Sequence, residues 1–270
     1  MKIGIISLGL IGGSLFKALV NRGYEVAAAT RNKNAIEEAK KYSPYISDKI
    51  EDLKDCNVIF VCSPMSATLD VLDRLEEILP EETIVADVCS LKEFVMNKKR
   101  PYTFIGTHPM AGTEHSGFDS SFKELFEGAK WILTPFEDTP ENSLQTLIKI
   151  INDTGAIPIT ANAKEHDEAA ALISHMPMVL AQALMKTAMN NTFALKIASS
   201  GFRDMTRLAL SNTVMAKDMV SLNNKNIKKM LDSFINNTNS LLSDDYSIQI
   251  EQIKDFRSKM YNSEGKNICN

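Results

Sequence analysis

The stretch Ser7-Leu8-Gly9-Leu10-Ile11-Gly12-Gly13-Ser14 stands between a short apolar run and a segment whose apolar residues have helical spacing. Against the pattern G-x-G-x-x-G, Ser7 takes the first position, Gly9 the third and Gly12 the sixth. A glycine at the third position lets the backbone approach a pyrophosphate, and one at the sixth lets strand and helix pack closely. Free N–H groups at the helix start also favour phosphate. The stretch therefore predicts a dinucleotide-binding turn, with a simple tight turn as the alternative.

Strand-like and helix-like patterns alternate around this turn. Short apolar runs predict strands at 2–7, 24–30, 57–62, 83–88, 104–107 and 131–134, and helical spacing predicts helices at 12–22, 33–42, 67–79 and 140–154. Strands that alternate with helices indicate a parallel sheet covered on both faces, which binds ligands at the carboxyl ends of its strands. We therefore expect an α/β fold that begins with a Rossmann-type doubly wound parallel sheet.

Glycine and proline are concentrated in the first part of the chain. Residues 1–160 hold ten of the 12 glycines and eight of the nine prolines. Because these residues interrupt helices, the remainder is predicted to consist of long helices, including the asparagine-rich stretch 223–239. We therefore expect two domains, a dinucleotide-binding domain at 1–160 and an all-α helical domain at 161–270.

The composition is that of an ordinary globular chain. Of the 270 residues, 44% are hydrophobic and 24% are charged. The net charge of −4 argues against a nucleic-acid partner, because a phosphate backbone calls for a basic surface. The four cysteines show no paired C-x-x-C spacing, so we expect no metal site and reduced thiols in a cytoplasmic protein.

Two apolar segments raise the question of a membrane. Segment 3–16 is too short to span a bilayer, although it imitates the core of a signal peptide, and the dinucleotide turn accounts better for its glycines. Segment 169–185 carries His175 and Pro177 in its middle and is predicted to be a buried helix. We therefore expect no membrane partner, with a secreted protein as the alternative.

The end of the second predicted strand bears on the choice of cofactor. It reads Ala29-Thr30-Arg31-Asn32, with no carboxylate to repel a 2′-phosphate. Arg31 could pair with that phosphate and Thr30 could donate a hydrogen bond, so NADP is expected in preference to NAD. The alternative is that Arg31 is only a solvated surface charge. The predicted cofactor-binding residues are Ser7, Gly9, Leu10, Ile11, Gly12, Thr30, Arg31 and Ser63.

Two polar residues follow other strands of the predicted sheet. His108 comes at the carboxyl end of the strand 104–107, where a histidine suits acid–base chemistry near neutral pH, although a structural histidine is the alternative. Ser90 follows the strand 83–88 and could bond to a substrate hydroxyl or orient His108. The alternative for Ser90 is the N-cap of a helix ahead of Glu93.

The helical part contributes arginines and histidines. Arg203 and Arg207 are four residues apart and can share a helix face, which suggests a carboxylate-bearing substrate. An ion pair within or between helices, for example with Asp204 or Asp167, is the alternative. His166 and His175 are nine residues apart, so their rings are expected on different sides of a helix and are poor candidates for one metal site.

Taken in order, these pieces resemble the prephenate and arogenate dehydrogenase family of tyrosine biosynthesis. The resemblance spans about residues 1–220. The matching residues are Gly9 to Ser14, Asp87 to Lys92, His108 to Glu114, His166-Asp167, Ser174 to Pro177 and Gly201 to Arg207. It implies a nucleotide-binding domain followed by a helical domain for substrate binding and dimerisation. The length suits the short, monofunctional form of the family.

The resemblance also implies an activity and its residues. The substrate would be a cyclohexadienol with a 4-hydroxyl and a ring carboxylate, oxidatively decarboxylated as hydride leaves C4. His108 matches the catalytic histidine and Ser90 the serine beside the 4-hydroxyl. His175 matches a histidine of the substrate pocket, and Arg207 the arginine that binds the carboxylate, while Arg203 is expected to pair with an acid.

Other positions bear on the substrate's side chain. Thr113 and Glu114 match a loop at the mouth of the pocket. Many members have a second histidine where this chain has Met178, and a tryptophan near Ala216. Prephenate carries a keto acid and arogenate an amino acid, which Glu114 could hold. We expect prephenate, with arogenate as the alternative.

Two alternative functions are weighed against this family. A β-hydroxyacid dehydrogenase-like enzyme would have small residues and asparagine around a lysine such as Lys164, and this pattern is missing. A non-catalytic nucleotide sensor would need none of the placed polar residues.

The helical part holds nine of the 13 methionines. This is more apolar surface than a small domain hides easily, so a homodimer through the helical part is expected. A self-contained helical bundle is the alternative.

Overall fold

The structure, a computed structural model, describes residues 1–113, 115–242 and 246–261. Its contacts divide the chain into two compact units, Met1–Asn224 and Lys225–Asn270. The first unit contains a sheet and most of the helices, and the second consists of α10 (Asn224–Leu241) beyond its first residue together with α11 (Tyr246–Met260). The asparagine-rich stretch is therefore helical, as predicted. The predicted boundary after residue 160 falls inside the first unit.

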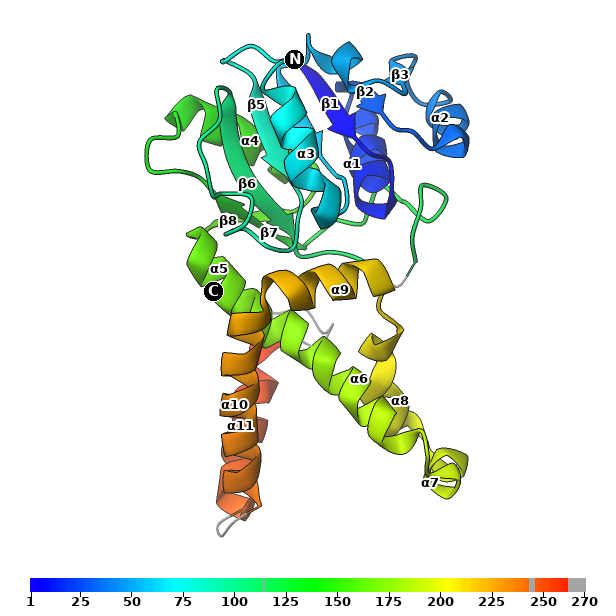
Figure 1. Cartoon of the computed structure of the whole chain (residues 1–270), viewed down its shortest axis with the longest axis vertical. Helices are drawn as coiled ribbons and strands as arrows, with labels where there is room; N and C mark the ends of the chain where they lie inside the picture. Colours follow the sequence, from blue (N-terminus) through cyan, green and yellow to red (C-terminus); the bar gives the residue numbers. More distant parts are fainter. Residues whose placement is uncertain (114, 243–245, 262–270) are drawn as a thin grey trace. The chain divides into compact units, whose positions relative to one another are not determined.

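The first unit is built on one eight-stranded sheet, and the Rossmann-type prediction is confirmed (Figure 1). The strand order is β3-β2-β1-β4-β5-β6-β7-β8. Two strands were not predicted, because β3 is only two residues long and β8 is an edge strand containing Pro158. The strands are β1 (Lys2–Ile6), β2 (Glu25–Ala29), β3 (Ile46–Ser47), β4 (Val58–Val61), β5 (Ile84–Asp87), β6 (Thr103–Pro109), β7 (Lys130–Thr134) and β8 (Ile157–Thr160).

One junction departs from the expected parallel sheet. Strands β1 to β6 are parallel, but β7 runs antiparallel to β6 and β8 runs parallel to β7. Parallel neighbours need a crossover, usually a helix, and the described residues between β6 and β7 contain no helix. In the resulting register, Thr107 pairs with Leu133, which in turn pairs with Thr160. The chain therefore leaves β8 level with the carboxyl end of β6.

Helices cover both faces of the sheet, as a doubly wound fold requires. On one face, α1 (Leu10–Asn21) and α4 (Glu141–Asp153) pack into an apolar core that includes Phe16, Phe60 and Trp131. On the other face, α3 (Met65–Leu75) packs into a second core. The smaller elements α2 (Lys33–Ala39) and η1 (Ile50–Leu53) lie between these strands and helices in the chain. The four helices predicted at 12–22, 33–42, 67–79 and 140–154 correspond to α1, α2, α3 and α4.

The rest of the first unit is helical. Met178 of α6 and Met219 of α9 belong to the second core, so these helices pack beside the sheet. The continuous run Ala163–Ala188 is long and apolar enough to cross a membrane by length and composition, and about a third of it is buried. Segment 169–185 is thus helical, as predicted, but only partly buried. The elements are α5 (Ala163–Ala170), the π-helical turn η2 (Ala171–His175), α6 (Met176–Ala188), α7 (Thr192–Ile197), α8 (Ser200–Thr206), η3 (Arg207–Leu210) and α9 (Thr213–Leu222).

Candidate functional site

Most of the predicted polar residues lie along one edge of the sheet. Because β1 to β6 are parallel, their carboxyl ends share an edge. Ser7 follows β1, Thr30 follows β2, Ser63 lies just beyond β4, Ser90 lies beyond β5, and His108 stands near the end of β6. Such an edge is where open α/β sheets bind ligands. The structure thus brings the predicted cofactor residues and the predicted base to the same edge.

The first turn has the backbone of a dinucleotide-binding turn despite its missing first glycine. Ser7 adopts a left-handed conformation, with φ of 74°, which is uncommon outside glycine. A Cβ added at Gly12 would lie 2.1 Å from the Ser7 carbonyl oxygen and 2.9 Å from the Cβ of Cys62. The sixth position of the pattern therefore accepts only glycine, because helix and strand meet there.

The other side of this turn has open space and uncapped backbone N–H groups. A Cβ added at Gly9 would meet nothing within 4 Å, so the third glycine position faces open space. Helix α1 begins at Leu10, and no side chain caps its first turn, which includes Ile11. Uncapped N–H groups at a helix start favour phosphate. These residues fit a dinucleotide pyrophosphate.

A cavity of about 470 Å³ adjoins the turn. Its lining includes the predicted cofactor residues Ser7, Thr30, Arg31 and Ser63. Thr30 is buried and Arg31 is exposed. The lining also includes Lys49, which the sequence had not singled out, and the cavity thus has cations near the end of β2.

Arg74 is the third cation of this cavity, and it is already paired. Its guanidinium donates to the Glu51 carboxylate at 2.8 Å. Asp48 and Asp70 also line the cavity. Neither Arg31 nor Lys49 has an ion pair among the described residues, so these two side chains are the ones available to an anionic ligand.

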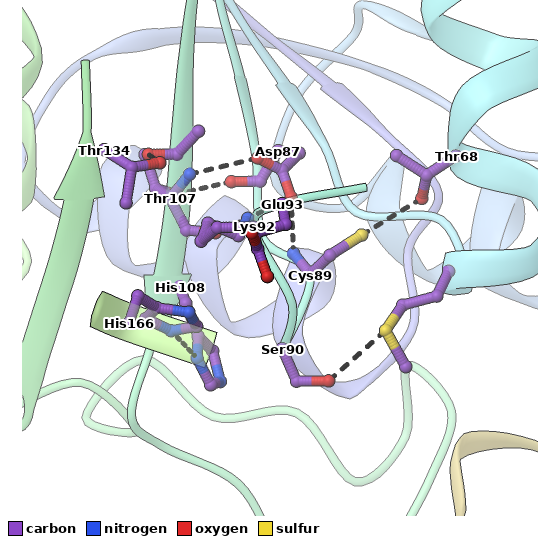
Figure 2. A network of polar contacts seen from close by, with 12 residues as sticks. Thr68, Asp87, Cys89, Ser90, Lys92, Glu93, Thr107, His108, Thr134 and His166 are labelled. Carbon is purple, nitrogen blue, oxygen red and sulfur yellow. Dashed lines mark hydrogen bonds and ion pairs between the residues drawn. The ribbon is translucent and has the colours of Figure 1, made fainter. Parts of the chain in front are cut away.

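His108 is held by a second histidine. Its side chain is half-buried, and its Nδ1 lies 2.9 Å from Nε2 of His166 in α5 (Figure 2). The two rings meet edge to face, with centroids 5.1 Å apart. Burial holds the pKa of His108 well below its usual range, and the neighbouring His166, Lys92 and His175 lower it further. His108 is therefore neutral at neutral pH and has a lone pair with which to accept a proton.

An ion pair is buried behind His108. The Lys92 ammonium donates to the Asp87 carboxylate, and both side chains are fully buried. The Asp87 carboxylate also accepts from the backbone N–H groups of Thr107 at 3.0 Å and Cys89 at 2.8 Å. Buried charges are retained only where they are paired and hydrogen-bonded. The network fixes the loop after β5 against β6 (Figure 2).

Asp167 of α5 secures the same loop. Its carboxylate accepts from the backbone N–H groups of Lys92 at 2.7 Å and Glu93 at 2.9 Å. No helix begins in the described loop after Ser90, so Ser90 is not the N-cap considered as its alternative role. The Ser90 hydroxyl instead donates to the sulfur of Met65 at 3.3 Å and makes no hydrogen bond to His108 (Figure 2).

His175 lies in the π-helical turn and is fully buried. Its Nδ1 lies 3.1 Å from the amide nitrogen of Asn223, which also donates to the Asp167 carbonyl oxygen at 2.9 Å. Its Nε2 is buried without a hydrogen-bond partner among the described residues. Burial lowers the pKa of His175 to about 4, although the Asp167 charge opposes this.

Of the remaining predicted substrate residues, Arg207 and Thr113 are described, and neither contacts His108. Arg207 begins η3 and is exposed, and the described residues supply no ion pair for it. Arg203 pairs with its neighbour Asp204 at 3.5 Å, as expected for a structural role. Thr113 is exposed, and Glu114 lies outside the described residues.

Metal and thiol chemistry find little support at this edge. In the part of the chain that the structure describes, no three His, Cys, Asp or Glu side chains could hold a metal ion together. Burial raises the pKa of the Cys62 and Cys89 thiols, so both stay protonated near neutral pH. Cys269 lies outside the described residues.

Three partners of the two histidines were missed by the sequence reasoning. His166 was considered with His175 for a metal site, and Asp167 as an ion-pair partner of an arginine. Asn223 was predicted only to lie in a helix. The signal available was the adjacent pair His166-Asp167 in the first turns after the predicted boundary. Its contact with His108 spans 58 residues of sequence and depends on the return of the chain along β7 and β8.

Comparison with known proteins gives matches over most of the chain. The family model described as prephenate dehydrogenase, nucleotide-binding domain, matches residues 16–160, and that described as prephenate dehydrogenase, dimerization domain, matches residues 162–260. The prephenate dehydrogenase of Bacillus subtilis strain 168 is 31% identical over 246 residues. That match covers 85% of this chain and 65% of the relative, so the chain spans less than two thirds of its length.

Two solved structures share the whole fold. Synechocystis arogenate dehydrogenase superposes with a TM-score of 0.81 at 29% identity, over 96% of this chain and 97% of that chain. Prephenate dehydrogenase from Aquifex aeolicus, in complex with hydroxyphenyl propionate and NAD+, superposes with a TM-score of 0.86 at 27% identity, over 95% and 97%. Together with the two family models, these matches show that the chain belongs to the prephenate dehydrogenase family.

Proposed function

We propose that this protein is an NAD(P)-dependent prephenate dehydrogenase of tyrosine biosynthesis, which converts prephenate to 4-hydroxyphenylpyruvate and carbon dioxide. The observation that carries the proposal is the neutral His108 at the sheet edge that it shares with the Gly9–Gly12 turn. A base beside a dinucleotide site is what oxidation of a hydroxyl requires. Family membership supplies the class of substrate.

The chemistry needs a proton acceptor and alignment. When bound, the dinucleotide takes the hydride that leaves C4 of the substrate. His108 takes the proton of the 4-hydroxyl, so that C4 becomes a carbonyl carbon. The bond from C1 to its carboxylate then breaks, its electron pair enters the ring, and the ring oxygen regains a proton. Because aromatisation drives the loss of carbon dioxide, the protein mainly has to orient the substrate and polarise the hydroxyl.

The other side chains are proposed to bind and orient the substrate. Ser90 would bond to the 4-hydroxyl once its weak contact with Met65 is given up, since sulfur is a poor acceptor. His175 would donate from its Nε2, which has no hydrogen-bond partner among the described residues. Arg207 would bind the ring carboxylate, because its guanidinium has no ion pair among the described residues. Thr113 and Glu114 would lie at the mouth of the pocket.

NADP is proposed as the preferred cofactor. Arg31 and Lys49 both line the cavity next to Thr30, where the second strand ends, and neither is paired with a carboxylate among the described residues. Two available cations suit a 2′-phosphate. A ratio of kcat/KM values for NADP over NAD above about 10 is expected, and its loss in Arg31→Ala would assign the preference to that side chain.

A homodimer formed through the helical part is also proposed, in a cytoplasmic protein. The apolar faces of α6 to α9 support the dimer, because they are exposed in a single chain and soluble monomers rarely expose so much. The division into a dinucleotide-binding domain at 1–160 and a helical domain at 161–270 is supported by the two family matches. The exposed large apolar residues of these helices include Leu184, Met189, Phe193, Ile197, Met205, Leu210 and Val214.

One assay tests the activity. Absorbance of the reduced nicotinamide is followed with prephenate and with arogenate, each against NAD and NADP. Turnover of prephenate with NADP as the most efficient combination is expected. A higher kcat/KM for arogenate would identify arogenate as the preferred substrate, the one in the name of the Synechocystis enzyme. Cofactor binding without turnover of either substrate would overturn the enzyme assignment.

A further inference from the structure

The carboxylate of Asp167 determines which nitrogen of His166 carries a proton. Oδ1 of Asp167 lies 2.7 Å from Nδ1 of His166. Because a carboxylate only accepts hydrogen bonds, Nδ1 of His166 is the donor. The same carboxylate accepts from the backbone N–H groups of Lys92 and Glu93. Its charge is therefore already balanced by neutral donors, and it does not require a cationic partner.

His166 in turn determines the protonation of His108. The Asp167 carboxylate takes one hydrogen bond from His166, through Nδ1, and two from backbone N–H groups. With its proton on Nδ1, a neutral His166 can only accept at Nε2, which lies 2.9 Å from Nδ1 of His108. His108 therefore donates from Nδ1. Because His108 is neutral, its Nε2 then carries a lone pair, and the described residues supply no partner for that nitrogen.

The main chain of Asp167 acts on His175 through Asn223. The Asp167 carbonyl oxygen accepts one hydrogen of the Asn223 amide group at 2.9 Å, which fixes that group's nitrogen toward α5. The same nitrogen lies 3.1 Å from Nδ1 of His175. An amide nitrogen only donates, so Nδ1 of His175 accepts. A neutral His175 then carries its proton on Nε2, the buried atom without a partner among the described residues.

We infer that Asp167 is a positioning residue that fixes His108 and His175 in opposite tautomers, His108 as an acceptor at Nε2 and His175 as a donor at Nε2. The inference rests on the proposed function for its purpose, since a substrate with a hydroxyl and a carboxylate needs one acceptor and one donor. One residue would thus assign both roles, through its side chain toward His166 and through its carbonyl oxygen toward Asn223. Figure 2 shows the contact between His166 and His108.

The decisive measurement is a long-range ¹H–¹⁵N correlation spectrum of the full chain labelled at histidine. The chain has only four histidines, so single substitutions assign every signal. At neutral pH without substrate, the expected result is a proton on Nδ1 of His108 and on Nε2 of His175. A proton on Nε2 of His108, as a cationic His166 would produce, or on Nδ1 of His175 would overturn the inference. Because no substrate is present, the result is independent of whether prephenate is turned over.

Asn223→Asp tests the arm that leads to His175. The substitution keeps the shape of the side chain but replaces its donor by an acceptor. Nδ1 of His175 is therefore expected to gain a proton in this variant, whether the ring changes tautomer or becomes charged. An Nδ1 that stays bare would show that Asn223 does not set the tautomer.

A matched pair of substitutions tests the arm that leads to His108. His166→Phe keeps a ring but removes the acceptor, and kcat is expected to fall about 10- to 100-fold, as when a supporting partner of a functional side chain is lost. The KM for substrate should change less than about threefold. His166→Gln restores an acceptor oxygen and should recover most of kcat. Equal kcat in both variants would contradict the inference, and the wild-type spectrum decides the question if either variant fails to fold.

Discussion

The sheet region and the helices α5 to α9 of the first unit differ in how many large apolar side chains they leave exposed. The sheet region buries charges in pairs, as Asp87 and Lys92 show, and exposes few large apolar side chains. Six described large apolar residues are exposed in 1–160, against 12 in the much shorter stretch 163–222. The Asp87–Lys92 pair is thus satisfied within one chain. The helical region leaves more apolar surface exposed, which is the surface proposed to form the dimer.

Removal of the base in the sheet region should have the largest effect. We expect His108→Ala to lower kcat about 10²- to 10⁴-fold, the usual contribution of a general base. Steady-state kinetics measure the change, and circular dichroism checks that the fold persists. An unaltered kcat would remove His108 from the mechanism and shift attention to the helices.

Breaking the buried pair of the sheet should cost nearly as much, in stability. Asp87→Asn leaves the Lys92 ammonium buried without a counter-charge, so the free energy of unfolding should fall by about 3–5 kcal/mol. Urea denaturation measures it. Asp138→Asn, which breaks the exposed pair with Lys99, is the matched control and should stay close to wild type. Equal losses in the free energy of unfolding of both variants would show that burial of the Asp87–Lys92 pair does not account for the effect.

Acidification should weaken the fold through the histidine of the helical region. Burial lowers the pKa of His175 to about 4 in the folded chain, against about 6.5 when unfolded. The unfolded state therefore binds more protons between these values, and stability present above pH 6.5 is lost as pH falls toward 4. The loss from His175 is about 3 kcal/mol.

Urea denaturation at pH 7 and pH 4 checks this expectation. His175→Gln cannot titrate in this range, so its stability should fall less than that of the wild type over the same interval. His108, whose pKa is also lowered, contributes a loss of the same sign to both proteins. Parallel losses in the two proteins would exclude His175 as the source.

Loss of the exposed guanidinium should affect binding rather than turnover. Arg207→Ala is expected to raise the KM for substrate about 10- to 100-fold, because a hydrogen bond to a charged group contributes about 1.5–3 kcal/mol. The value of kcat should change much less. Arg203→Ala is the matched control, since Arg203 pairs with Asp204 on the protein surface. Unchanged substrate saturation in Arg207→Ala would remove this residue from the site.

The smallest effect is expected at the uncovered helices. Phe193 of α7 is 69% exposed in one chain, and a charge there should raise the dissociation constant of the proposed dimer at least about tenfold. Light scattering across a dilution series compares Phe193→Asp with Tyr45→Asp, which changes an exposed aromatic residue of the sheet region. Dissociation of both variants alike, or a monomeric wild type, would contradict the contrast between the two regions.

The sequence predicts the sheet region well because its signals are local. The apolar run 83–88 corresponds to β5 (Ile84–Asp87), and His108 was expected at the strand end where it lies. The two-residue β3 offers no periodicity, and Pro158 hides β8. The antiparallel step between β6 and β7 was missed because alternation was extended over a connection that has no helix.

The contacts of the site depend on that missed step. The pairing of Thr107 with Leu133, and of Leu133 with Thr160, returns the chain to the level of His108 before α5 begins. His166 and Asp167 reach their partners only because of this return. Sequence reasoning named the catalytic candidate but could not supply partners that lie 58 residues away. Ser7 shows a local limit as well, since its left-handed backbone could not be read from a serine.

The π-helical turn Ala171–His175 has a consequence for insertions and deletions in this chain. A π-turn holds one residue more than the corresponding α-turn. Because the wider turn already absorbs that extra residue, deleting one residue there would restore a uniform α-helical pitch and leave α6 facing the same way relative to α5. Deleting one residue within α6 itself would instead turn the residues beyond it by about 100°. The π-turn is therefore a part of this helix where the chain can shorten by one residue without moving the buried and exposed faces of α6.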